Sequence, residues 1–394
     1  MKSNWYIKKM PQVVKWGSGG TPKATVKEYY ENGNIPWLII GDLNDGVVLS
    51  SENYITTKGL ENSSAKMIPV GTLLVAMYGS IGKLGITGIE CCTNQAIAFA
   101  KELYGVTTKF MYYQMKYLKP KLVSMGKGGT QKNISQTVLN ALDVIVPPID
   151  EQQRIVDKIE ELFSKLDKGV EELNKIKEQL KIYRQAVLKE AFENMPEKKA
   201  IKELSVIITS GSRGWAKYYE DSGARFIRIT DLTRDGIDLK NDKKQYVNLP
   251  VNVEGRRSRL QENDVLVSIT ADLGSIALVP KNIGEAYINQ HIAMIRFSNP
   301  KQGKFMAWYL KSEYGQKELL KNKRGAGKLG LGLDDIRYTI APNVDDTFAN
   351  RVVENIEQKL SVCDNLEQTV NASLQQAESL RQSILKKAFE GKLV

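Results

Sequence analysis

Residues 150–193 carry a heptad pattern, which restricts the folds open to this chain more than any other feature does. Apolar residues recur there with alternating spacings of four and three, which is typical of a helix that packs against another helix. Proline is absent from the stretch, but Pro147, Pro148 and Pro196 flank it, as expected near helix ends. A helix of about forty residues is about 60 Å long, and its apolar side needs a partner.

The chain supplies that partner in residues 347–390. A shift of half the chain length aligns the two stretches without a gap and pairs LKEAFE with LKKAFE at their ends. The same shift pairs Asp167 with Asp364 and Arg184 with Arg381. Two similar helices at this spacing indicate an internal duplication.

We predict that one apolar row on each stretch forms the seam of a helix pair. Gly169 interrupts the row in the first stretch, and a local break of the helix is expected there. The predicted seam consists of Ile155, Ile159, Leu162, Leu166, Leu173, Ile176, Leu180, Val352, Ile356, Leu366, Val370, Leu380 and Ile384.

The segments before the two helices repeat each other as well. TLLVAMYGSIGKLGI (72–86) is answered by DVLVSITADLGSIAL (264–278), and NQAIAF (94–99) by NQHIAM (289–294). Short apolar runs separated by glycine-rich turns predict strands, whereas residues 107–123 predict a helix disturbed at Pro120.

The order of these parts predicts an α+β fold in which two globular mixed α/β domains are joined by two long antiparallel coiled-coil helices. The second helix covers its seam by running back along the first, which gives an internal pseudo-twofold repeat. The predicted parts are a first domain (1–149), a first long helix (150–195), a second domain (196–346) and a second long helix (347–394).

The net charge of +11 lies outside the two helical stretches. Basic globular parts favour a polyanionic partner such as nucleic acid. No window of about twenty apolar residues predicts a membrane span, and the N-terminus lacks the apolar core of a signal peptide. Three cysteines form no disulfide framework, so a cytoplasmic location is expected.

Few motifs for catalysis or metal binding are present. We find no Asn/Asp-Pro-Pro-aromatic tetrapeptide, which amino-methyltransferases use to hold the target amine. The single histidine, His291, lies in an apolar run, which favours a structural role. One histidine and scattered cysteines do not make a usual zinc site. The chain is therefore predicted to have no catalytic residue, no metal and no cofactor of its own.

With these motifs, the chain resembles the specificity subunits of type I restriction–modification systems (the HsdS family). The ordered set carries the resemblance: the two strand–loop segments, the two Asn-Gln runs, VPPIDEQQRIVDKIEELF (146–163) and the paired LK(E/K)AFE helix ends. It implies two target-recognition domains, each reading one half of a bipartite sequence in double-stranded DNA. The helices would set the spacer and bind two methyltransferase subunits, and restriction endonuclease subunits would join them. S-adenosylmethionine, ATP and Mg²⁺ would belong to those partners.

The DNA-binding candidates are loop residues with hydrogen-bond donors. Lys and Arg neutralise phosphates, and Arg, Gln and Asn also pair with base edges. The first domain has no arginine whereas the second has many, so the two half-sites are expected to differ. Asn94-Gln95 and Asn289-Gln290 are expected to brace loops rather than to read bases. The candidates are Ser18, Thr21, Lys23, Tyr78, Ser80, Lys83, Lys127, Thr130, Gln131, Lys132, Ser212, Arg213, Trp215, Lys217, Thr270, Arg324 and Lys328.

Two other functions are open on the sequence alone. A coiled-coil scaffold could join two globular domains that bind proteins and not DNA, although the positive charge of those domains disfavours this function. A self-sufficient DNA-modifying enzyme is disfavoured by the missing catalytic motifs.

Overall fold

The computed structural model of the chain describes residues 4–128, 132–250, 256–321 and 330–394. Packing groups them into two compact units, Met1–Leu173 with Ala372–Val394, and Asn174–Asn371. Each unit contains one globular part together with a segment of each of two long helices.

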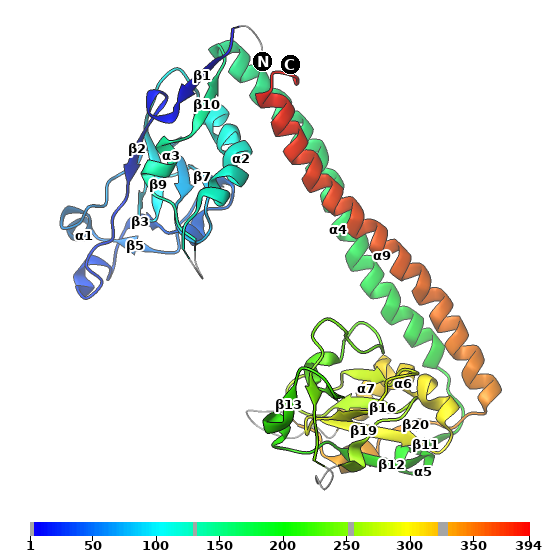
Figure 1. The fold of residues 1–394 in the computed structure, drawn as a ribbon. Coiled ribbons are helices and arrows are strands. Elements are labelled where there is room, and N and C mark those ends of the chain that lie inside the picture. The colour runs from blue at the N-terminus through cyan, green and yellow to red at the C-terminus, as the bar shows by residue number, and fades with distance from the viewer. Residues whose placement is uncertain (1–3, 129–131, 251–255, 322–329) are drawn as a thin grey trace. The chain divides into compact units, whose positions relative to one another are not determined.

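The two long helices are α4 (Ile149–Phe192) and α9 (Asp346–Phe389), drawn in green and in orange to red in Figure 1. They confirm the predicted long helices and the mixed fold of two domains joined by helices. The predicted domain boundaries stay a prediction, because packing groups each globular part with the helix segments against it. Among the described residues, no helix has the length and apolar character needed to cross a membrane.

The globular part of the first unit is built on a five-stranded sheet with the order β2-β9-β6-β7-β4. A three-stranded sheet, β5-β3-β8, and the pair β1-β10 complete it. The strands are β1 (Tyr6–Lys9), β2 (Val14–Ser18), β3 (Ile35–Leu38), β4 (Gly46–Val48), β5 (Tyr54–Ile55), β6 (Leu73–Ala76), β7 (Leu84–Thr87), β8 (Cys92–Thr93), β9 (Ile97–Leu103) and β10 (Asp143–Val146). The helices are η1 (Met10–Gln12), η2 (Lys27–Tyr29), η3 (Ile40–Asp42), α1 (Thr57–Glu61), α2 (Thr108–Met125) and α3 (Gln136–Asn140).

The second unit repeats this plan with the sheet orders β12-β19-β16-β17, β13-β15-β14-β18 and β11-β20. The parallel pair β3–β8 of the first unit has its counterpart in β14–β18. The strands are β11 (Lys198–Ala200), β12 (Ser205–Ser210), β13 (Tyr219–Glu220), β14 (Ala224–Ile227), β15 (Tyr246–Val247), β16 (Val265–Ser268), β17 (Ile276–Leu278), β18 (Ala286–Ile288), β19 (Ile292–Phe297) and β20 (Ile340–Pro342). The helices are η4 (Trp215–Tyr218), η5 (Ile229–Asp231), η6 (Arg256–Ser258), η7 (Pro300–Gln302), α5 (Ile201–Leu204), α6 (Gly303–Lys311), α7 (Glu313–Leu319) and α8 (Leu333–Arg337).

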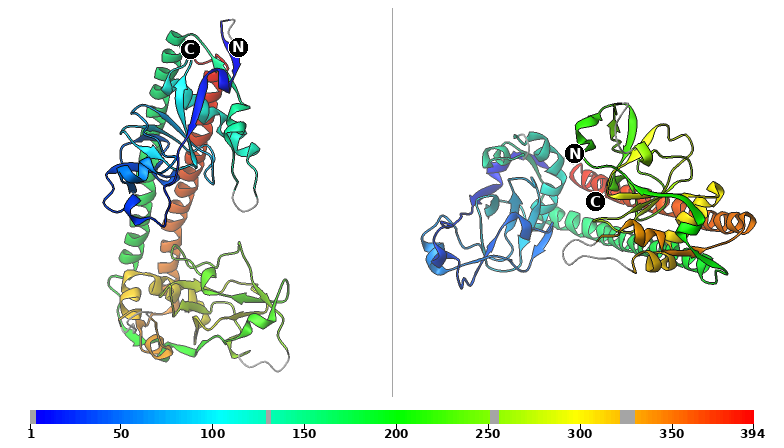
Figure 2. Two further views of the ribbon diagram at one scale, coloured as in Figure 1. Left: turned by 90° about the vertical axis from the view of Figure 1, so that its left-hand side faces the viewer. Right: turned by 90° about the horizontal axis from the view of Figure 1, so that it is seen from below.

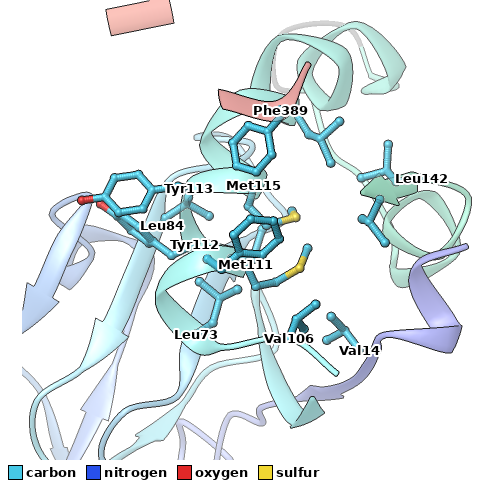
Figure 3. Packing of buried hydrophobic residues seen from close by; sticks show 14 of the residues in the cluster. Val14, Leu73, Leu84, Val106, Met111, Tyr112, Tyr113, Met115, Leu142 and Phe389 are labelled. Atoms are coloured by element: carbon cyan, nitrogen blue, oxygen red, sulfur yellow. The ribbon is translucent and has the colours of Figure 1, made fainter. Parts of the chain in front are cut away.

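Each long helix ends in a phenylalanine that is buried in the core of its unit. In the first unit the ring of Phe389 packs edge-on against Phe110 of α2, with centroids 5.5 Å apart, and stacks on Tyr117. Figure 3 shows Phe389 beside the α2 residues Met111 and Met115. In the second unit Phe192 packs against α6 in the same way, 5.4 Å from Phe305. The repeated LK(E/K)AFE sequence therefore anchors each globular part to a long helix. Helix α2 runs through Pro120, so the predicted disturbance does not end it.

Within each unit the segments of α4 and α9 run side by side, as the two views of Figure 2 also show. In the second unit the guanidinium of Arg184 lies 2.6 Å from Asp364 and 2.9 Å from Glu367. Farther along α4, Glu190 pairs with Lys359 at 2.8 Å. As the residue numbers rise along α4, those of the paired residues on α9 fall, so the two segments are antiparallel.

The first unit contains the matching ion pair, between Arg381 of α9 and Asp167 of α4. The four residues Arg184, Asp364, Arg381 and Asp167 are those that the sequence repeat aligns. Duplication of the chain has therefore produced one interhelical ion pair in each unit.

The observed seam differs from the predicted one at alternate positions. Ile176, Leu366 and Leu380 are 39%, 48% and 46% exposed, so their assignment to the seam was wrong. The buried positions lie one residue later in each heptad, as at Phe163 and Leu360.

The remaining predicted seam residues are at least partly covered. Ile155, Ile159, Leu180, Ile356, Val370 and Ile384 are buried, and Leu162, Leu166, Leu173 and Val352 are half-buried. Gly169 lies outside the seam, and α4 continues through it without the predicted break.

The interhelical ion pair of the second unit leads to a stability prediction. Arg184→Ala leaves Asp364 and Glu367 facing each other without their cation, so it should lower the free energy of unfolding by about 1–3 kcal/mol. Arg154→Ala is the control, because its pair with Asp150 is exposed, and such pairs contribute about 0.3–0.5 kcal/mol. Chemical denaturation measures both; equal losses would contradict the assignment of Arg184 to the seam.

The corrected seam leads to a second prediction, on one helix. Phe389→Ala removes a side chain that is 1% exposed and should cost about 3–5 kcal/mol of unfolding free energy. Leu380→Ala, at a position that is 46% exposed, should cost less than about 1 kcal/mol. A loss at Leu380 as large as that at Phe389 would restore the seam predicted from the sequence.

Candidate nucleic-acid interface

Loops from distant parts of the chain meet in each globular part. We define the first loop cluster as residues 18–23, 77–83, 94–96 and 132–134. Main-chain hydrogen bonds hold it together: Gly20 N donates to Thr93 O at 2.8 Å, and Met77 N donates to Ala96 O at 2.8 Å. Ile134 N donates to Met77 O at 2.8 Å.

The second loop cluster comprises residues 210–217, 269–275, 289–291 and 330–331. Its hydrogen bonds correspond to those of the first, since Ile269 N donates to His291 O at 3.0 Å and Leu331 N donates to Ile269 O at 2.9 Å. Ser212 forms an isolated bridge with Asn289. The two clusters therefore share one main-chain framework and differ in the side chains that it carries.

The asparagine of each Asn-Gln pair holds the framework, as predicted. Asn94 Oδ1 accepts a hydrogen bond from Ala96 N at 3.1 Å, and Asn289 Oδ1 accepts one from His291 N at 3.1 Å. The opening loop lies directly against this turn, because a Cβ at Gly211 would come within 1.9 Å of Ile288 O. Only glycine allows so close an approach.

The adjacent glutamines take different partners in the two clusters. The Thr21 hydroxyl forms a hydrogen bond with Gln95 Oε1. Gln290 Nε2 lies 3.0 Å from His291 Nε2, and the Nδ1 atom of His291 lies 2.7 Å from the Thr270 hydroxyl. Because the amide nitrogen can only donate, His291 Nε2 accepts and its Nδ1–H donates to Thr270. Both ring nitrogens of His291 are thus engaged in structural hydrogen bonds.

A cleft of about 690 Å³ opens in the second loop cluster. It is lined by Ser210, Gly211, Ser212, Arg213, Gly214, Trp215, Lys217, Tyr218, Arg257 and Gln290. The structure therefore brings four of the predicted DNA-binding residues together, namely Ser212, Arg213, Trp215 and Lys217. Arg213, Lys217 and Arg257 are exposed and make the cleft basic.

Two residues of this cleft differ from the sequence expectation. Trp215 is 4% exposed and packs against Phe226 and Tyr287, with ring centroids 5.6 and 5.4 Å apart. It supports the cleft wall rather than presenting a face for base stacking. Arg257 was missed, because η6 enters the cleft from a segment that has no counterpart among the recognised repeat motifs.

In the first loop cluster most of the predicted residues reach solvent. Lys83 is the exception, since its Nζ donates to Ile40 O at 3.2 Å and braces the neighbouring loop. Thr130, Gln131, Arg324 and Lys328 lie outside the described residues. The exposed candidates are Ser18, Thr21, Lys23, Tyr78, Ser80 and Lys132, together with Lys127, which is hydrogen-bonded to Asn133 at the edge of the cluster.

Two equivalent lysines support loops near the clusters from inside. Lys116 Nζ lies 3.4 Å from Asp45 O, and Lys311 Nζ donates to Thr233 O at 3.1 Å. Burial lowers the pKa of Lys116, and it lowers the pKa of Lys311 to about 8. Both lysines therefore hold loops through main-chain carbonyls.

Within the described ranges, no three His, Cys, Asp or Glu side chains come close enough together to hold a metal ion. The chemistry available in the two clusters is that of hydrogen-bond donors and cations on an open surface.

Comparisons with known proteins agree with this arrangement. The family described as "Type I restriction modification DNA specificity domain" matches residues 2–181. The EcoKI specificity subunit of Escherichia coli (strain K12) is 23% identical, over 100% of this chain and 90% of that protein. The EcoBI subunit of Escherichia coli is 24% identical over 72% of this chain, and the EcoR124I/EcoR124II subunit is 30% identical over 41%. The matches span 65% and 43% of those two relatives' lengths.

Solved structures show the same fold. A chain from work on the assembly and conformational transition of the type I R-M system superimposes with a TM-score of 0.78 at 16% identity, covering 100% of this chain and 99% of the other. The HsdS subunit of Thermoanaerobacter tengcongensis gives a TM-score of 0.55 at 16% identity, with coverage of 100% and 98%. The family match, the relatives and the shared fold lead to one conclusion: residues 2–181 match the type I restriction–modification DNA specificity domain, and the chain as a whole is similar to the specificity subunits of these systems.

Proposed function

We propose that this chain is the non-catalytic subunit that recognises double-stranded DNA for a type I restriction–modification complex. The observation that carries the proposal is the basic cleft of the second loop cluster. There Arg213, Lys217 and Arg257 converge with the amide of Gln290. Cations neutralise phosphates, while arginine and amide side chains also pair with base edges.

The target is a bipartite and asymmetric sequence, with one half-site for each globular part. The two clusters share a framework, but Thr21 corresponds to Arg213, and Tyr78 to Thr270. Side chains with different donors and acceptors select different bases. Two such surfaces on one chain therefore read two different sequences.

The long helices set the spacer between the half-sites and dock two methyltransferase subunits. Support for docking comes from the apolar side chains that the seam leaves exposed, among them Ile176, Tyr183 and Leu366. S-adenosylmethionine serves the methyltransferase subunits, ATP and Mg²⁺ serve restriction endonuclease subunits, and the assembled complex works in the cytoplasm.

A scaffold whose two globular parts bind only proteins agrees less well with the structure. Protein binding alone does not explain a cleft lined by three exposed cations. Absence of salt-dependent DNA binding by the complex with methyltransferase subunits would favour the scaffold.

The cleft predicts that the two halves of the target respond separately to mutation. Arg213→Ala should weaken binding about tenfold or more and relax base preference at one position of a single half-site. Lys127→Ala changes a residue of the other globular part. It should weaken binding but leave the base preference unchanged in the half-site that Arg213→Ala alters. Selection of randomised duplexes by the complex measures both variants. Relaxed preference in both half-sites after the Arg213 change would contradict one half-site per globular part.

The role of the helices in setting the spacer is testable by shortening both of them. Deleting residues 171–177 and 368–374 removes one heptad from each helix at equivalent positions, keeps the seam in register and retains both interhelical ion pairs. The separation falls by about 10.5 Å, which is about three base pairs of about 3.4 Å each. The preferred spacer should shrink by that amount in methylation mapping. An unchanged spacer with unchanged half-sites would show that the helices do not set it.

A further inference from the structure

Gln95 and Gln290 occupy the same place in two loop clusters that otherwise present different side chains. Each follows an asparagine whose side chain closes the same turn. The backbone of that asparagine is also fixed in the same way, because Asn94 N donates to Leu38 O at 3.0 Å and Asn289 N donates to Ile227 O at 3.1 Å. The framework therefore delivers a glutamine to one defined position in each globular part.

Neither glutamine is needed to hold the turn, since the asparagine does that. Gln95 is exposed, and Gln290 is half-buried at the wall of the basic cleft. Both are tied by one hydrogen bond to a neighbouring side chain, Gln95 to Thr21 and Gln290 to His291. This fixes the orientation of each amide.

After these hydrogen bonds are formed, both amides keep an N–H group that can bind another partner. Gln95 uses its oxygen, which leaves both N–H groups of Nε2 for another partner. Gln290 uses one N–H on His291, which leaves its second N–H. A donor is thus available on both side chains. Both glutamines can therefore bind, in the same way, a ligand that accepts hydrogen bonds.

We propose that Gln95 and Gln290 each donate a hydrogen bond to a phosphate oxygen of the DNA backbone and so anchor the two heads independently of sequence. The inference rests on the proposed function. Two surfaces that read different bases share the phosphate backbone, and a residue that is the same in both heads fits that shared feature. Arg213, Lys217 and Arg257 surround Gln290 with the positive charge that a phosphate requires.

The varied residues beside the glutamines then select the bases. Ala96 in the first cluster corresponds to His291 in the second, and Tyr78 corresponds to Thr270. Because His291 binds both Thr270 and Gln290, it fixes the distance between a base-facing hydroxyl and the phosphate anchor. The first cluster has no such link, since alanine cannot form it.

The test uses the full chain copurified with its methyltransferase subunits and a randomised duplex library. Gln290→Glu keeps the shape of the side chain but replaces donors by a negative charge, so affinity should fall about tenfold or more. The selected sequence should stay unchanged in both half-sites. Gln95→Glu, in the first globular part, should also lower the affinity and leave both half-sites unchanged. Asn282→Asp, the same chemical change at an exposed position of the second unit outside the cleft lining, is the control and should bind as the unaltered chain does.

A charged replacement gives an independent readout. Gln290→Lys should retain binding and steepen the dependence of log affinity on log salt by about 0.9, as expected for one added phosphate contact. A loss of affinity for Gln290→Glu confined to particular base pairs would overturn the phosphate contact and make Gln290 a base reader. Normal affinity for Gln290→Glu would overturn it as well. If the unaltered complex failed to bind any duplex, the proposed function would fail, and the phosphate contact with it.

Discussion

The architecture of this chain depends on an arginine placed in the seam between two antiparallel helices. Removing a guanidinium from water is unfavourable unless carboxylates compensate it, and Asp364 and Glu367 do so for Arg184 at 2.6 and 2.9 Å. The pair forms in one register only, because a slip by one residue would bury the charge without its partners. Its copy, Arg381 with Asp167, pairs the two helix segments of the first unit in the same way. Apolar residues beside the seam, such as Ile176 and Leu366, stay exposed.

The helices were predictable and their contact surface was not. Heptad spacing and the repeat located both long helices to within a few residues, because forty residues of periodic pattern outweigh local variation. The row of contacts was misplaced by one residue in alternate turns. In the predicted seam Ile176 stood in place of Lys177, and Leu380 in place of Arg381, because they are more apolar. A long charged side chain covers apolar surface with its methylene stem and places its charge beside a partner. Hydropathy counts such a residue as polar and therefore does not assign it to the seam.

The candidate interface divides in a similar way. The internal repeat identified the loops that meet in each globular part, since equivalent motifs must occupy equivalent places. The direction of individual side chains depends on contacts with segments far away in the sequence. Lys83 turns inward to a carbonyl of a neighbouring loop, Trp215 is held by two aromatic rings, and Arg257 enters the cleft from η6. The asparagines of the Asn-Gln pairs were correctly predicted as braces, because a short amide after a strand commonly closes a turn. The glutamines brace loops as well, since Gln95 joins its turn to the opening loop through Thr21 and Gln290 holds the ring of His291.

By the proposed function, one chain carries two separate and different DNA-reading surfaces. Single-molecule mapping of methylated adenines, in cells that express the chain with its methyltransferase subunits, tests this most directly, because it returns the whole recognised sequence. Two short, unlike sequences separated by a spacer of fixed length and free composition are expected. A single uninterrupted sequence, or two halves that form a perfect palindrome, would contradict it.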